Sequence, residues 1–185
     1  MTNDVKIKFE SKDKSLYDLA YLSIDLNQVL VFGELLNDNN FYELYNLYFN
    51  EGAFKLTRQN HTLRYYSENI KIVSIKEGCI EIILTGISIL SSALITYLGI
   101  VISNKIKEKD EKLLFEINPN DKELNDLINK YDKGDFGKDG DSLNWLIMLL
   151  AHKGYSTEII TQDAFRIQKV IDKYEQRITK IITKN

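Results

Sequence analysis

The chain lacks the several cysteines typical of small secreted proteins and the excess of basic residues typical of nucleic-acid-binding proteins. Its 185 residues include a single cysteine and one proline, and 24 basic side chains stand against 27 acidic ones for a formal net charge of −3. Cys79 has no partner for an internal disulfide, so nothing requires an oxidising compartment. Nucleic-acid-binding proteins usually carry a strong basic excess, so we expect no nucleic-acid partner. The first 14 residues lack the apolar core of a secretory signal, and we expect none.

Signatures of catalysis are also missing. The only two histidines, His61 and His152, fall in a turn-like segment and near a predicted helix end, and no glycine-flanked serine accompanies them. A triad needs a nucleophile, a base and an orienting carboxylate together. Cys79 lies in a predicted hairpin, where burial makes a thiol inert. The sequence therefore favours a non-enzymatic protein without a cofactor, leaves an enzyme of unrecognised type open as an alternative, and provides no catalytic residue to assign.

One acidic loop resembles a site for a hard cation. Its aspartates are the oxygen ligands that calcium or magnesium prefers, and they are Asp132, Asp135, Asp139 and Asp141. A calcium loop needs a glutamate at its twelfth position, which is Leu146 when counted from Asp135. We interpret the loop as solvated and expect no metal site.

The patterns that are present predict an α+β fold. Hydrophobic residues make up 44% of the chain and charged residues 28%, as in ordinary globular domains. Alternation predicts a strand from Val5 to Glu10, and two β-branched runs around Lys76-Glu77-Gly78 predict a hairpin. The expected sheet is antiparallel, with four or five strands between Val5 and Leu84. Its other predicted strands are residues 53–57, 62–66, 70–75 and 79–84.

Helical periodicity predicts the elements that cover this sheet. A helix from Ser15 to Leu36 begins with a weak capping box, since Asp18 lies three residues after Ser15. Residues 41–49 predict a short aromatic helix. The C-terminal part predicts one strand at 112–117 and helices starting at Asp121, at Ser142 and near Ser156 or Thr161, the last with Phe165, Val170, Tyr174, Ile178 and Ile181 as its apolar positions. We divide the chain into an α+β domain (1–85), an apolar helix (86–104) and a mainly helical region (105–185).

The apolar helix is the most informative segment. No charged side chain occurs from Ile82 to Asn104. A helix from Gly86 to Ser103 is about 27 Å long, close to the thickness of a bilayer core. Lys105, Lys107 and Lys109 follow it, a bias that places its C-terminal side in the cytoplasm. A single membrane span, a helix buried in a soluble oligomer and a helix at a membrane interface all remain open, so the predicted location is the membrane or, alternatively, the cytoplasm.

A stripe of small and hydroxyl residues runs along this helix. In lipid, such a stripe lets helices approach closely, and in water it suits the contacts of a helical bundle. Either environment predicts a homo-oligomer. The residues that we expect to mediate self-association are Ser88, Ser92, Thr96, Gly99 and Ser103.

A second cluster suggests a ligand site. Aromatic residues are dense between Phe41 and Tyr66, and Arg58 and Arg64 lie among them. Aromatic rings can stack on a flat ligand, and arginines can pair with its phosphates. The alternative is an aromatic layer between helix and sheet. The candidate ligand-binding residues are Arg58, Arg64, Tyr65, Tyr66, Tyr45 and Tyr48.

Two functional hypotheses follow. The first is a self-associating single-pass membrane protein that contacts lipid, acts as a pore or tethered effector, and binds a partner through its soluble parts. The second is a soluble homo-oligomer that binds a small molecule, such as a nucleotide, through residues 41–66.

Overall fold

A computed structural model describes residues 3–10, 15–50, 65, 70–76, 79–108, 115–120, 122, 125, 126, 151 and 157–183. It confirms the α+β class, because a four-stranded antiparallel sheet is combined with long helices. The strands are β1 (Asn3–Glu10), β2 (Ile70–Lys76), β3 (Cys79–Ile87) and β4 (Phe115–Pro119). The helices are α1 (Leu16–Asn37), α2 (Phe41–Leu44), the π-helix η1 (Tyr45–Phe49), α4 (Ile89–Glu108) and α7 (Thr157–Ile182).

The strand order is β2-β3-β1-β4, and each neighbouring pair is antiparallel. With α1 after β1 and α4 after β3, this is the β-α-β-β-α-β connectivity of the split β-α-β, or ferredoxin-like, arrangement. That arrangement supports many unrelated functions, so the topology alone assigns none.

The predicted hairpin is confirmed as β2 and β3, and the fourth strand of the sheet, β4, overlaps the separate strand predicted at 112–117. β4 lies beyond the predicted limit of Leu84 and pairs with β1, with Ile117 opposite Ile7. The predicted strand at 53–57 lies outside the described residues. Tyr65, the one described residue of the predicted strand at 62–66, is helical. The strand predicted at 112–117 is therefore confirmed as β4, although its place in this sheet was not predicted. The strand predicted at 62–66 is wrong at Tyr65.

The start of α1 is as predicted, whereas α4 begins later than predicted. Ser15 Oγ accepts from the backbone N–H of Asp18, and the Asp18 carboxylate accepts from that of Ser15, completing the capping box. Gly86, the predicted start of the apolar helix, still belongs to β3, with a left-handed φ of 67° that suits glycine. Helix α4 follows at Ile89, after Ser88 Oγ accepts from the N–H of Ser91.

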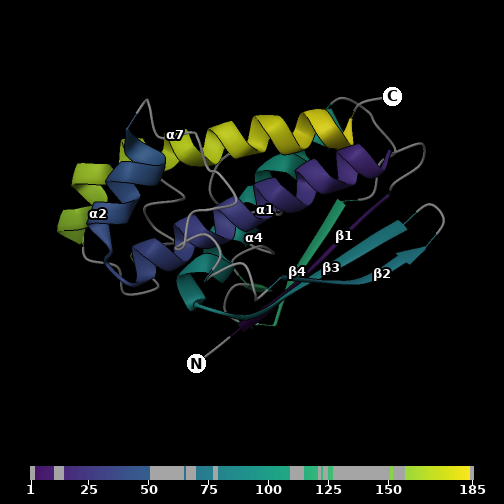
Figure 1. Cartoon of the computed structure of the whole chain (residues 1–185), viewed down its shortest axis with the longest axis horizontal. Coiled ribbons are helices and arrows are strands. Elements are labelled where there is room, and N and C mark those ends of the chain that lie inside the picture. Colours follow the sequence, from purple (N-terminus) through teal and green to yellow (C-terminus); the bar gives the residue numbers. More distant parts are fainter. Residues whose placement is uncertain are drawn as a thin grey trace.

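The elements form three layers (Figure 1), with the sheet on one side, α1 and α4 in the middle, and α7 on the other side. Helix α4 contacts β1 and β4, and α7 contacts both α1 and α4. Val5, Ile7 and Phe9 are at most 2% exposed, while Lys6, one position out of phase, pairs with Glu81 at 2.9 Å. The middle helices therefore have protein on both sides, which explains why they are apolar around most of their circumference.

Helices α1 and α4 are both long and apolar enough to cross a membrane, and both fit equally well as core helices. Of the residues in these apolar windows, 61% are buried in α1 and 72% in α4. The buried core cluster includes Val5, Leu94 and Ile182, so the ranges 1–85, 86–104 and 105–185 all contribute to one core.

The small-residue stripe of α4 lies largely inside the single chain. Ser92 and Thr96 are at most 1% exposed, and Gly99 is buried, while Ser88 and Ser103 are half-buried. The chain's own layers thus occupy most of the surface that we predicted to meet a second copy. Self-association through the stripe stays a prediction.

Candidate functional site

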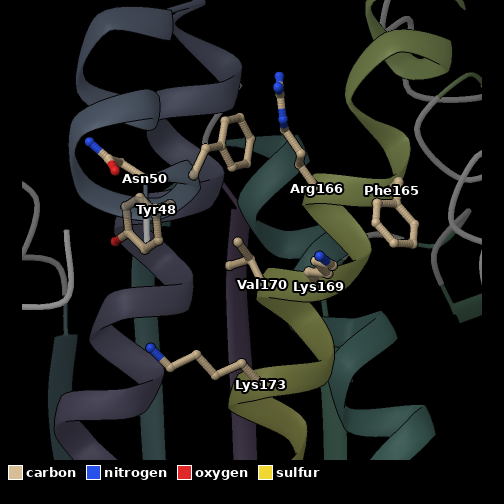
Figure 2. A pocket seen from close by; sticks show the side chains of 8 residues that line it. Tyr48, Asn50, Phe165, Arg166, Lys169, Val170 and Lys173 are labelled. Atoms are coloured by element: carbon tan, nitrogen blue, oxygen red, sulfur yellow. The ribbon is translucent and has the colours of Figure 1, made fainter. Parts of the chain in front are cut away.

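A pocket of about 470 Å³ lies between η1 and α7 (Figure 2). Its volume is within the usual range for small-molecule sites. The residues that line it are Tyr48, Phe49, Asn50, Phe165, Arg166, Lys169, Val170 and Lys173.

Aromatic packing fixes the η1 side of the pocket on α1. The rings of Tyr48 and Phe49 lie 5.0 and 6.1 Å from that of Phe32, and Tyr48 OH donates to the backbone carbonyl of Gln28 at 2.8 Å. Burial raises the pKa of Tyr48 well above its usual value, so the phenol keeps this proton. The segment is a single π-helical turn, a distortion that occurs frequently at functional sites.

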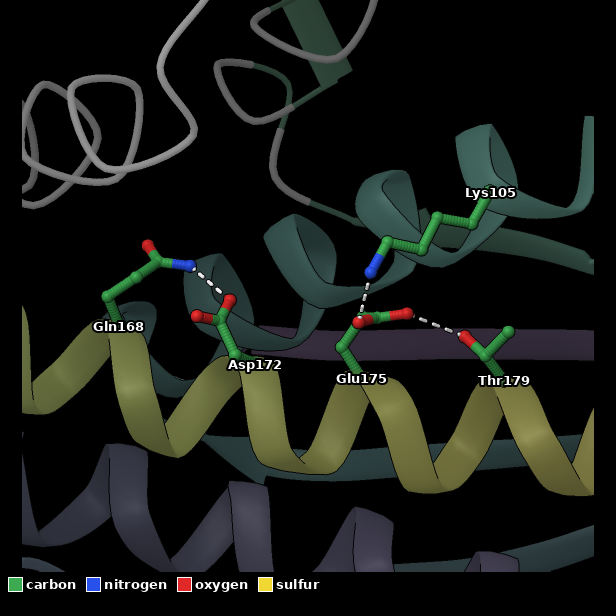
Figure 3. A network of polar contacts seen from close by, with 5 residues as sticks. All are labelled: Lys105, Gln168, Asp172, Glu175 and Thr179. Atoms are coloured by element: carbon green, nitrogen blue, oxygen red, sulfur yellow. Dashed lines mark hydrogen bonds and ion pairs between the residues drawn. The ribbon is translucent and has the colours of Figure 1, made fainter. Parts of the chain in front are cut away.

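Charge is segregated on α7. Arg166, Lys169 and Lys173 recur at spacings of three and four, so they share one side of the helix, beside the pocket. Asp172 and Glu175 lie on the side toward α4 (Figure 3), where they accept from Gln168 and Lys105, both at 2.6 Å. The charged residues lining the pocket are therefore all basic.

Each of these three cations has a different neighbour. The guanidinium of Arg166 lies 5.0 Å from the ring centroid of Tyr45 and donates to the Tyr45 hydroxyl. Lys169 Nζ is 4.7 Å from the ring of Phe165. Lys173 points toward α1 (Figure 2), where Asp25 attracts its charge. Contacts with aromatic faces of this kind stabilise cations.

A buried ion pair supports the end of the pocket near Lys173. Asp25 is 1% exposed, and Arg177 donates to it through Nε at 3.0 Å, with Nη2 2.8 Å from the other oxygen. Burial raises the pKa of Asp25, and Arg177 opposes this shift. Burial and the charge of Arg177 lower the pKa of Lys173 to about 8, so Lys173 is still mostly protonated at neutral pH.

The pocket combines an apolar floor with a basic rim. Tyr48 and Val170 are buried and Phe49 is half-buried. Asn50, Phe165, Arg166 and Lys169 are exposed at the edge. This arrangement can hold an apolar group against the floor while the rim contacts an anionic group.

The structure places the predicted ligand residues unevenly. Tyr48 lines the pocket, and Tyr45 holds Arg166 at its edge. Tyr65 is 74% exposed. Arg58, Arg64 and Tyr66 lie outside the described residues. The ligand-binding role of all six stays a prediction.

Sequence reasoning missed the basic side of α7. The predicted apolar positions Val170, Tyr174 and Ile178 are buried. Phe165 is 65% exposed at the pocket edge, because Ala164 and Ile167 are the buried residues at this end of α7. The spacing of Arg166, Lys169 and Lys173 was a usable signal for a basic surface.

The other candidate sites from the sequence are less defined. His61, His152 and the acidic loop at 132–141 lie outside the described residues, and the side chain of Cys79 is not described either. Within the described part of the chain, no group of three or more His, Cys, Asp or Glu residues is placed to hold a metal ion.

Comparisons with known proteins do not assign the chain. A scan of family models finds no match, and neither the curated proteins nor the solved structures give one. Any functional conclusion therefore depends on the geometry of the pocket.

Proposed function

We propose that this protein is a binding protein for a small anionic molecule that also carries a flat apolar group. The ligand occupies the pocket between η1 and α7. Its apolar group packs against Tyr48, Phe49 and Val170, and its anionic group contacts the basic rim. This proposal keeps the small-ligand hypothesis from the sequence, but the positive charges that contact the ligand come from α7 rather than from Arg58 and Arg64.

One observation carries the proposal. Arg166, Lys169 and Lys173 are the charged residues that line the pocket, although the chain as a whole has a net charge of −3. Three positive charges at one pocket raise the local concentration of anions and give charge-assisted hydrogen bonds to them. The aromatic floor adds apolar contact area beneath them.

An anionic aromatic dye tests the site directly. We expect anilinonaphthalene sulfonate to bind the folded protein and to gain fluorescence in a saturable titration. The double variant Lys169→Gln/Lys173→Gln should weaken this binding by about tenfold, because a charge-assisted hydrogen bond contributes roughly 1.5 kcal/mol or more.

The matched control is Lys180→Gln, which removes the same charge from an exposed position of α7 that does not line the pocket. This variant should bind the dye as the wild type does. Equal dye affinity of the wild type and the double variant would contradict the proposal, as would an equal loss in the control.

The membrane hypothesis is the second candidate, and the observation that favours it is the length and composition of α1 and α4. For α4 to span a bilayer and to self-associate through its stripe, α1, α7 and the sheet would all have to move away from it. The N–H of Ser88 would then lose Glu34, and the apolar side chains that α4 covers on these elements would be exposed to water. We therefore favour the core-helix interpretation and a cytoplasmic location.

A further inference from the structure

The three cations of the pocket are spread along α7. Arg166 and Lys173 are separated by about 10 Å along the helix axis, at roughly 1.5 Å per residue. A hydrogen bond to an anion requires a separation of about 3 Å between heavy atoms. Long side chains can converge on one anion only if their charged ends are free to do so.

In this pocket the charged ends are directed apart. The Tyr45 hydroxyl and ring hold Arg166 at one end, and the ring of Phe49 lies 5.9 Å from the same guanidinium. Lys169 extends over Phe165. Lys173 extends toward α1 and Asp25 (Figure 2). A single small anion therefore cannot contact all three cations without breaking these contacts.

We propose that the ligand carries two or more phosphate groups in a row, as in a nucleoside diphosphate or triphosphate. This inference rests on the proposed function and specifies its ligand class. A chain of phosphates distributes its charge along the same direction as the cations and offers several acceptor oxygens to each one. Arg166 suits bidentate contact with phosphate, and the lysines act as point charges.

The flat group of such a ligand has a defined place. Val170 lies between Arg166 and Lys173 on α7 (Figure 2). Phe49 lines the same pocket, with its ring 5.9 Å from the Arg166 guanidinium. Together they offer an apolar surface next to the cations. A base can pack against this surface while its phosphates follow the rim. Stacking on an aromatic ring tolerates different bases, so the phosphate number, rather than the base, governs affinity.

Calorimetric titrations test this with adenosine, AMP, ADP, ATP and inorganic tripolyphosphate, in buffer with a chelator and no divalent cation. We expect affinity to rise about tenfold from AMP to ATP, the equivalent of one added charge-assisted contact. Arg166→Gln and Lys173→Gln should each reduce this ratio severalfold, whereas Lys180→Gln should leave it unchanged.

The outcomes separate the two proposals. If AMP binds as tightly as ATP, the phosphate inference is wrong and the anion-binding function stands. If the dye binds but no nucleotide or tripolyphosphate does, the inference is also wrong. If neither the dye nor any phosphate compound binds, both the phosphate inference and the proposed function are wrong. Tighter binding of ATP than of AMP, with the difference reduced in Lys173→Gln, supports the inference. Binding of tripolyphosphate without binding of any nucleotide would contradict the place given to the base.

Discussion

Replacing Arg177 by methionine should lower the free energy of unfolding by about 3–5 kcal/mol at neutral pH. The reason is an asymmetry in the ion pair. Asp25 has 1% of its side chain exposed, whereas Arg177 has 41%. Loss of the arginine leaves a buried carboxylate without its hydrogen-bonded counter-charge, and only the more distant charge of Lys173 then acts on it. Isolating this buried carboxylate costs more free energy than isolating the half-exposed arginine.

The reverse variant should cost less. In Asp25→Asn, the remaining arginine is partly in water, so we expect a loss of roughly 1–2 kcal/mol. Urea unfolding followed by circular dichroism measures both, with Lys180→Met as a surface control within about 0.5 kcal/mol of the wild type. Equal losses in the two variants would contradict the ion-pair geometry.

The pH dependence gives this prediction a second readout. Burial already raises the pKa of Asp25 above its ordinary value, and removal of Arg177 removes the main influence that opposes this shift. The folded variant then binds a proton more tightly than the unfolded chain does. Stability therefore rises as pH falls toward the unfolded pKa, and the deficit of Arg177→Met relative to the wild type should shrink between pH 7 and pH 5.

Gly33→Ala should also destabilise the protein, against the usual preference of helices for alanine. Gly33 lies where α1 crosses α4, and a Cβ atom there would be 2.5 Å from Ser91 Oγ and 2.7 Å from Ser91 Cα. Alanine normally gains about 0.5–1 kcal/mol over glycine in a helix. Because a backbone atom must move, we expect overpacking to dominate, with a net loss of about 1–3 kcal/mol.

A compensating variant distinguishes this clash from a general effect. Gly33→Ala/Ser91→Gly removes the serine side chain that the new methyl group meets, so it should recover part of the loss relative to Ser91→Gly alone. Chemical denaturation of the wild type, the two single variants and the double variant gives the free energy of unfolding of each protein in this double-mutant cycle. If Gly33→Ala is more stable than the wild type, α1 and α4 do not cross at this point.

Local patterns in the sequence were enough to predict several elements. The capping box fixed the start of α1, and the β-branched runs fixed the hairpin of β2 and β3. The start of α4 was predicted wrongly at Gly86. A glycine after an apolar strand is compatible with a helix start, but here Gly86 is a strand residue with a left-handed φ.

Long-range packing was beyond the sequence patterns. A helix that is apolar all round must be buried, but its own residues do not reveal what buries it. Helix α4 is covered by α1, by β1 and β4, and by α7, which begins about fifty residues after α4 ends. The pocket has the same origin, because Tyr45 and Arg166 are 121 residues apart in the sequence and meet only in the folded chain.

In the fold described, α1 and α4 are covered by their own chain. High-speed centrifugation of a lysate without detergent, followed by hydrogen exchange of the recovered protein, tests this most directly. We predict that the protein stays in the supernatant and that the amides of α4 from Leu90 to Ile106 are among the slowest to exchange. Recovery only in the membrane pellet, with extraction only by detergent, would contradict the account.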